Sequence, residues 1–125
     1  MRARPVQRVA AIGAVATALL ACGCTHTVRV GAGRTVDVAL TEYRLNPDSV
    51  TATAGKLTIV ARNFGRMTHD ITIIHGSTVL KSTAPIAPGH TGTVTITLAP
   101  GTYTMASTIL SDQALGQLGT LTVTR

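Results

Sequence analysis

The sequence predicts an all-β domain, a β-sandwich or barrel of about seven strands. Short runs in which apolar and polar residues alternate recur along the chain, threonine and valine are abundant, and glycine and proline stand between the runs. Alternation with a period of two is typical of strands with one buried face, and β-branched residues favour strands. Turn residues at short, regular spacing between such runs favour a sandwich or a barrel.

The expected strands follow one another from the first alternating run to the end of the chain. In order, they lie at residues 35–40, 50–52, 57–61, 69–75, 94–98, 103–105 and 121–123. Turn signals such as Asn46-Pro47-Asp48 and Asn63-Phe64-Gly65 separate them. On the fourth strand His69 and His75 share a face. They would be about 20 Å apart on a straight strand, so they are not expected to bind the same ion.

Residues 1–21 are typical of a secretory signal peptide. A basic start containing three arginines precedes a short apolar run, residues 9–21, which is too short to span a bilayer as a permanent helix. The run ends in Leu19-Leu20-Ala21-Cys22, which resembles the bacterial lipobox. The sequence therefore predicts an exported protein that is lipidated on Cys22, with Cys24 as the alternative.

Lipidation of a cysteine would make the lipid bilayer a partner of this protein. Cys22 and Cys24 are separated by one residue, so a disulfide between them would be strained. Acyl chains on one of them would anchor the domain to the lipid bilayer of a bacterial envelope, since each buried methylene contributes about 0.8 kcal/mol. Residues 22–33 are then expected to be a lipidated terminus and flexible tether, and residues 34–125 the folded domain.

The charge of the chain argues against a nucleic-acid partner. The whole sequence carries a formal net charge of +6, which falls to +3 without the three arginines of the leader. The remaining cations are scattered and have no aromatic residues between them. Nucleic-acid binding is therefore not expected.

An ordered set of short motifs resembles the small bacterial cupredoxins, relatives of plastocyanin and azurin. The resemblance covers residues 34–125. It is carried by Leu45-Asn46-Pro47, Val50-Thr51-Ala52-Thr53-Ala54-Gly55, Asn63-Phe64-Gly65, His69-Asp70, Leu98-Ala99-Pro100-Gly101-Thr102-Tyr103-Thr104 and Gly119-Thr120-Leu121-Thr122-Val123. It implies a Greek-key β-sandwich, with a mononuclear copper site at one end and ligands in the long loop before the last strand.

Only one of the four ligands that the resemblance implies is present. His69 matches the first histidine, whereas the family's cysteine falls on Ser107, its second histidine on about Asp112 and its axial methionine on about Gln117. Glutamine can serve as a weak axial ligand, but a serine hydroxyl cannot replace the thiolate of a blue-copper site. Type 1 copper is therefore not expected, and Ser107 marks a vestigial ligand position.

A weaker metal site, without the thiolate, is a second hypothesis for this end of the domain. His69, Asp112 and Gln117 are expected to converge at one end of the sandwich, with the thioether of Met67 beside them. Imidazole and oxygen ligands suit Cu(II) or Zn(II), and thioethers suit Cu(I). The alternative is that His69 is a remnant of the ligand set at the rim of the sandwich, hydrogen-bonded to the backbone or to Asp112.

Two functions follow as hypotheses. No nucleophile elbow, phosphate-binding glycine loop or paired carboxylates with a mechanistic role are found, so an enzyme is not expected. The first hypothesis is a membrane-anchored, non-catalytic binding module, in which the degenerate cupredoxin-like end contacts an envelope protein or a small ligand. The second is a weak carrier of copper or another metal ion that uses His69, and neither is a blue-copper electron-transfer protein.

Overall fold

A computed structural model describes residues 26–125. The predicted signal peptide and both predicted lipidation sites, Cys22 and Cys24, lie outside these described residues. Among residues 26–125 there is no helix long and apolar enough to cross a membrane.

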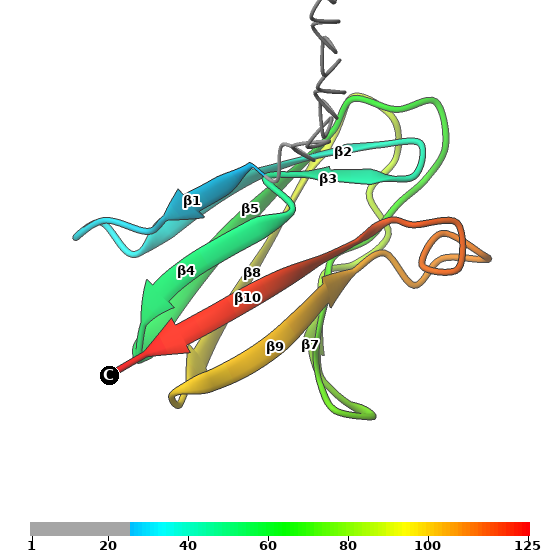
Figure 1. The fold of residues 1–125 in the computed structure, drawn as a ribbon. Coiled ribbons are helices and arrows are strands. Elements are labelled where there is room, and N and C mark those ends of the chain that lie inside the picture. Colours follow the sequence, from blue (N-terminus) through cyan, green and yellow to red (C-terminus); the bar gives the residue numbers. More distant parts are fainter. Residues whose placement is uncertain (1–25) are drawn as a thin grey trace, which may run out of the picture.

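The described chain folds into ten β-strands in two sheets, which lie face to face as two layers (Figure 1). The strands are β1 (Thr27–Arg29), β2 (Thr35–Thr41), β3 (Arg44–Asn46), β4 (Ser49–Thr53), β5 (Gly55–Asn63), β6 (Thr72–His75), β7 (Thr78–Ser82), β8 (Thr91–Leu98), β9 (Gly101–Ala106) and β10 (Leu118–Thr124). One sheet has the order β1-β4-β10-β9-β6-β7, and the other has the order β3-β2-β5-β8. The all-β sandwich predicted from the sequence is confirmed.

The chain crosses between the two sheets several times, which places sequence-distant strands side by side. The pairs β1/β4, β4/β10 and β2/β5 are parallel, and the remaining pairs are antiparallel. Parallel neighbours cannot be joined by a tight hairpin, so each requires a crossover. The strands β9 and β10, in contrast, are antiparallel neighbours that the chain connects directly. The long loop 107–117, which carries the site, joins them.

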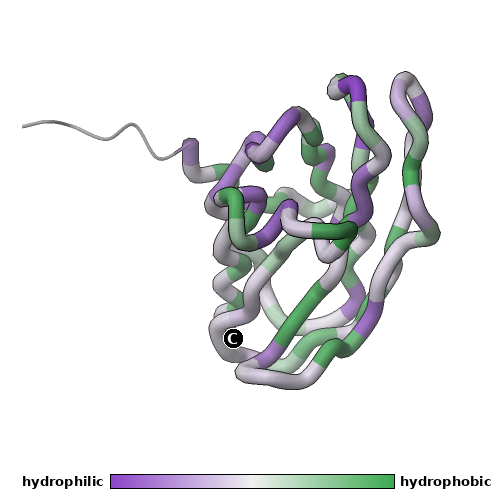
Figure 2. Tube along the Cα trace, turned by 90° about the vertical axis from the view of Figure 1, so that its right-hand side faces the viewer, coloured by the Kyte–Doolittle hydropathy of each residue, from purple (hydrophilic) through white to green (hydrophobic). Residues whose placement is uncertain are grey.

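The core lies between the sheets and is built from alternate strand positions, as Figure 2 shows in the alternating hydropathy along the strands. In β2, Val36, Val38 and Leu40 are buried, and the intervening residues are exposed or half-buried. Burial of such a side chain stabilises the fold by about 1.5–3 kcal/mol. The period-two pattern therefore identified the core faces correctly.

The fourth expected strand is shorter than the sequence predicted. It was expected over residues 69–75, but β6 begins at Thr72, and His69 makes only an isolated bridge with Ile86. The reason is that side chains take the backbone donors there: the Asp70 N–H donates to Ser107 Oγ at 3.1 Å, and the Ile71 N–H donates to Thr83 Oγ1 at 3.1 Å. His69 therefore sits on an irregular segment between the sheets.

The expected flexible tether, residues 22–33, is also too long. Its described part contains β1, which pairs in parallel with β4 and places Val28 and Val30 against the core. These two half-buried valines give the segment an apolar face, which is the physical reason that it joins the sheet. Three of the ten strands, β1, β3 and β7, were not expected, because each is short or has little buried surface.

Gly119 in β10 should not tolerate a side chain. A Cβ there would lie 2.5 Å from the backbone oxygen of Asp48, whereas a Cβ at Gly33 would have nothing within 4 Å. We expect Gly119→Ala to lower the free energy of unfolding by about 2 kcal/mol, because backbone must shift to accept the methyl group. Gly33→Ala is the control, and equal urea midpoints for the two variants would contradict the prediction.

Candidate functional site

The loop between β9 and β10 folds over one end of the sandwich (Figure 1, orange). It is held by its own backbone: Asp112 N–H donates to Ile109 O at 3.1 Å, and Gln117 N–H donates to Asp112 O at 2.9 Å. The loop closes where Ser107 N–H donates to Gln117 O at 3.1 Å. These bonds bring the two ends of the loop together and turn Asp112 inward.

His69, Asp112 and Ser107 form a buried hydrogen-bonded cluster at this end. His69 and Ser107 have no exposed surface, and Asp112 is 2% exposed. The same carboxylate oxygen, Asp112 Oδ2, lies 2.8 Å from His69 Nδ1 and accepts the Ser107 hydroxyl at 2.7 Å. A carboxylate is only an acceptor, so His69 donates through Nδ1–H. The structure thus brings together three of the predicted site residues.

Asp70 fixes the start of the loop against the histidine segment. Its Oδ1 accepts the Thr108 N–H at 2.5 Å, and its Oδ2 accepts the Thr108 hydroxyl at 2.8 Å. Its own N–H donates to Ser107 Oγ. No sequence pattern predicted a role for Asp70, and its position next to His69 is the one signal that points to it.

Gln117 lies at the same end, but its side chain turns toward a different element. Its Nε2 donates to Thr41 O at 2.8 Å, and its Oε1 is buried without a hydrogen-bond partner in the described chain. The predicted set of His69, Asp112 and Gln117 therefore splits into a His69–Asp112 contact and a separate, inward-facing amide.

Glu42 is the site residue that the sequence analysis missed. Its Oε1 accepts the N–H groups of Arg66 at 2.5 Å and Met67 at 2.9 Å, and it lies 3.5 Å from His69 Nε2. Gly65 lies directly against it, since a Cβ on Gly65 would lie 2.4 Å from that oxygen and the Glu42 side chain would have to move. No local pattern marks Glu42, because its partners come from a loop that is distant in the sequence.

The Glu42 carboxylate is stabilised in its charged form. The N–H groups of Met67 and then Arg66, which donate to it, lower its pKa below the usual value of 4.5. A lowered folded-state pKa adds stability that is complete above about pH 4.5 and is lost as the pH falls through the lowered value.

Glu42→Gln should therefore reduce stability in a pH-dependent way. Glutamine keeps an oxygen acceptor for the two N–H groups but removes the charge. We expect urea denaturation to show a lower midpoint than wild type at pH 7, and the difference between the two midpoints should be smaller at pH 3, because the contribution of the charge is lost as the pH falls below 4.5 toward the lowered pKa. A gap of the same size at both pH values would mean that the charge of Glu42 does not contribute.

Met67 stands at the mouth of a small pocket beside the cluster. The pocket, of about 200 Å³, is lined by Tyr43, Met67, Leu110, Ser111, Asp112 and Leu115. Met67 is 38% exposed, with its sulfur 3.9 Å from the Tyr43 hydroxyl, and Leu110 and Leu115 are more exposed still. We call Met67, Leu110 and Leu115 the apolar rim.

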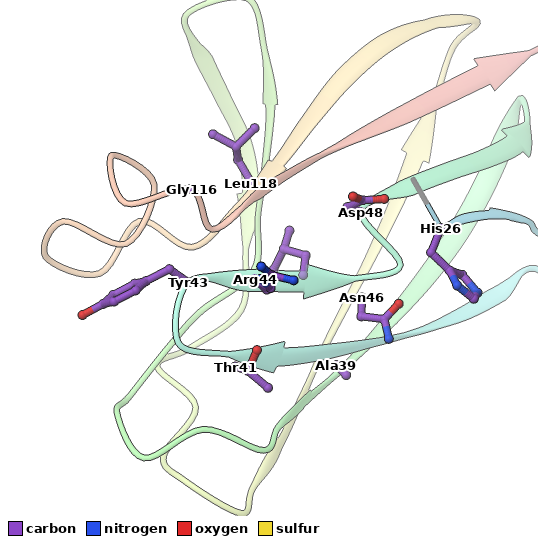
Figure 3. Close-up of a pocket in the computed structure, with 10 residues that line it drawn as sticks. His26, Ala39, Thr41, Tyr43, Arg44, Asn46, Asp48, Gly116 and Leu118 are labelled. Carbon is purple, nitrogen blue, oxygen red and sulfur yellow. The ribbon is translucent and has the colours of Figure 1, made fainter. Parts of the chain in front are cut away.

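A larger cavity, of about 520 Å³, lies on the other side of Tyr43 and contains none of the predicted site residues. Figure 3 shows its lining, with His26, Asn46 and Asp48 on one side and the Tyr43 ring pointing away from them. The small pocket, not this cavity, adjoins the chemistry of His69.

The donors at the end of the sandwich do not fit a type 1 copper centre. The positions that the cupredoxin resemblance assigns to ligands hold an imidazole, a hydroxyl, a carboxylate and an amide. The hydroxyl, on Ser107, donates its proton to Asp112. Blue-copper chemistry requires a thiolate. Within residues 26–125 no three His, Cys, Asp or Glu side chains are grouped to hold a metal ion.

Solved structures with this architecture include auracyanins and rusticyanin. The chain matches reduced auracyanin from Roseiflexus castenholzii with a TM-score of 0.70 and 24% identity, over 76% of this chain and 100% of that one. It matches auracyanin A, a "blue" copper protein from Chloroflexus aurantiacus, with a TM-score of 0.64 and 20% identity over 77% and 99% of the two chains. Reduced rusticyanin follows, with a TM-score of 0.59 and 18% identity over 78% and 84%. At these identities the likeness establishes the fold.

Sequence comparison agrees with the fold. The iron uptake system component EfeO of Escherichia coli K12 is 30% identical over 77 residues, which are 62% of this chain and 20% of EfeO. The same component from Shigella flexneri matches equally. The chain thus spans about a fifth of the length of these relatives. The family model of the cupredoxin-like domain matches residues 11–123, and the chain therefore belongs to the family of cupredoxin-like domains.

Proposed function

We propose that this chain is an exported, lipid-anchored envelope protein whose cupredoxin-like domain is a non-catalytic binding module of a metal-handling system. The observation that carries the proposal is the cluster at the end of the sandwich. Asp112 Oδ2 is bonded to both His69 and Ser107, so the place of a copper ligand set is filled by a closed polar network. Similarity to an iron uptake component supports the link to metals.

The surroundings of the cluster favour binding over electron transfer. The apolar rim surrounds a pocket next to the buried polar network. Exposed apolar side chains that gather around a concave site are typical of contact surfaces for proteins or small ligands. None of residues 26–125 supplies the thiolate that a blue-copper redox centre needs.

The lipid anchor would hold the domain by the end that carries the loop. Thr27 pairs with Ser49, which in turn pairs with Thr120, only a few residues after the loop 107–117. Five residue steps separate Cys22 from Thr27, a reach of at most about 18 Å. An anchor at Cys22 would therefore keep this side of the domain close to the bilayer and to partners embedded in it.

A second candidate function is a weak metal carrier, and one observation favours it. His69 Nε2 is buried, has no hydrogen-bond partner within the described residues, and faces the Glu42 carboxylate at 3.5 Å. An imidazole nitrogen and a carboxylate together suit Cu(II) or Zn(II).

Deletion and complementation test the proposed function. A strain that lacks the chain should differ from its parent in cell-associated iron, copper or zinc, measured by elemental analysis under limiting and excess metal. The wild-type gene should restore the content, and a Cys22→Ser/Cys24→Ser version, which loses membrane fractionation, should not. Unchanged contents of all three metals would refute the proposal, as would an intense thiolate-to-copper absorption band in the purified protein.

A further inference from the structure

Large exposed apolar side chains gather at the end of the sandwich that carries the site. The loop after β5 and the loop 107–117 extend from this end (Figure 1, green and orange). Seven such side chains are exposed among residues 26–125, and five of them lie in or directly beside these two loops: Phe64, Met67, Leu110, Leu115 and Leu118. The other two, Val79 and Leu80, lie on β7. Exposed apolar side chains that gather in one place mark contacts with proteins or membranes.

The tip of the loop exposes its leucine in an unfavourable backbone conformation. Leu110 is 86% exposed and has a φ of 52°, in the left-handed region that a bulky residue rarely adopts. Tyr43, which lines the small pocket together with Leu110, has a φ of 66°. The loop backbone is hydrogen-bonded around them, since the Leu115 N–H donates to Ser111 O at 3.0 Å. An exposed leucine gains nothing from the fold, so a contact outside the chain is the physical reason for this arrangement.

The described chain begins beside the same loop. His26 lines the cavity of about 520 Å³ together with Gly116 and Leu118, at the end of the loop (Figure 3). In the sheet, Thr27 is two strands away from Thr120, about 10 Å at the usual strand spacing. The predicted lipidation site, Cys22, is four residue steps before His26, a reach of at most about 14 Å. Acyl chains on Cys22 would therefore enter a bilayer close to the apolar rim.

The charges at this end complement anionic lipid headgroups. Arg44 and Arg66 are exposed, and each adjoins in sequence a residue that lines the small pocket. Neither arginine has an ion pair within the described part of the chain. The acids nearby are occupied, since Asp112 is buried in the cluster and Glu42 accepts two backbone N–H groups. Unpaired cations beside an apolar surface are attracted to a membrane that carries anionic lipids.

We propose that the apolar rim inserts into the interfacial layer of the lipid bilayer, with Arg44 and Arg66 at the headgroups. The loop 107–117 is then a second membrane contact beside the acyl anchor, and it fixes how the domain is oriented. Interfacial segments bind in this way, with apolar side chains buried about 5–10 Å into the boundary between headgroups and acyl chains. This inference rests on the lipid anchor of the proposed function and identifies what the rim touches once the anchor holds it.

Tryptophan fluorescence tests the contact, because the natural chain contains no tryptophan. The full chain carrying Leu110→Trp is reconstituted into vesicles of zwitterionic and anionic phospholipids. We expect a blue-shifted emission and a loss of intensity when the lipids are brominated near the top of their acyl chains. Leu115→Trp, at a second exposed position of the rim, should respond in the same way.

The matched control is Val79→Trp. Val79 is 59% exposed and lies on β7, at the edge of the sheet opposite to β1, where the anchored segment enters. Its tryptophan should emit as in water and should not be quenched by the brominated lipids. Quenching of this control as strong as that of Leu110→Trp would overturn the proposal, because the domain would then have no preferred face toward the bilayer.

Two further results would overturn the proposal. One is an emission of Leu110→Trp and Leu115→Trp that brominated lipids do not change. The other is a response that occurs in native membranes but not in pure lipid vesicles, because the rim would then contact a protein. The intact mass of the chain reports its acyl chains independently. A lipidated chain whose introduced tryptophans stay in water would leave the proposed anchor standing without this contact, whereas a quenched chain without acyl groups would keep the contact and refute the anchor.

Discussion

The double variant Ser107→Cys/Asp112→His should acquire an intense visible absorption band when Cu(II) is added. The two substitutions supply the thiolate and the second imidazole at the positions that the cupredoxin resemblance assigns to them. His69 already directs Nδ1 toward position 112, and Ser107 Oγ lies 2.7 Å from the same carboxylate oxygen. Two imidazoles and a thiolate are the strong ligands of blue-copper sites.

The fourth position is left as Gln117, whose amide lies apart from the His69–Asp112 contact and is held on Thr41 O through Nε2. Gln117 Oε1 is buried and has no partner in the described part of the chain, and a glutamine oxygen can serve as the weak axial ligand. Each single variant is a control: Ser107→Cys alone lacks the second imidazole, and Asp112→His alone lacks the thiolate, so neither should match the double variant. If the folded double variant binds Cu(II) without a visible band, the loop does not bring these positions into ligand geometry.

Asp112→Ala should lower the free energy of unfolding by about 3 kcal/mol. The variant removes the acceptor shared by His69 Nδ1 and Ser107 Oγ, and both donors are in a fully buried environment. Each unsatisfied buried group costs about 1–3 kcal/mol, and partial rearrangement of Ser107 offsets some of the sum. Urea denaturation followed by circular dichroism measures the loss.

Asp112→Asn is the matched control. The amide has nearly the same shape and keeps one oxygen acceptor, so a loss of about 1 kcal/mol is expected. A larger loss for alanine than for asparagine would locate the stabilisation in the shared acceptor. Wild-type stability of Asp112→Ala would show that the cluster contributes nothing to folding, and the argument that it replaces a metal site as a closed network would fail.

Several parts of the fold could be predicted because they depend on neighbouring residues. The strand cores follow from alternation, and the Tyr103 hydroxyl donates to Ala99 O at 2.8 Å, a contact four residues away. The edge strands β1 and β3 were missed, since strands of three residues carry too little pattern. The strand β7 has no buried face, for every one of its residues is exposed.

The candidate site also has a part that could be predicted from the sequence and a part that could not. The resemblance placed His69, Ser107 and Asp112 at one end of the sandwich, and the structure brings them into contact. It did not indicate that Asp112 faces Nδ1. Nor did it indicate that Glu42 faces Nε2, because no spacing rule links a residue at the end of β2 to a loop after β5.

The sequence by itself therefore determined the all-β class, the alternating core and the loss of the thiolate at Ser107. The first two depend on residue type and on short-range periodicity, and the third on the motifs that resemble the cupredoxins, all of which the chain carries whatever its tertiary arrangement. Only the tertiary structure decided that His69 leaves the strand, that a single carboxylate oxygen joins it to Ser107, and that Glu42 approaches its other nitrogen. Those contacts join residues far apart in the chain, and the packing of the two sheets sets their distances.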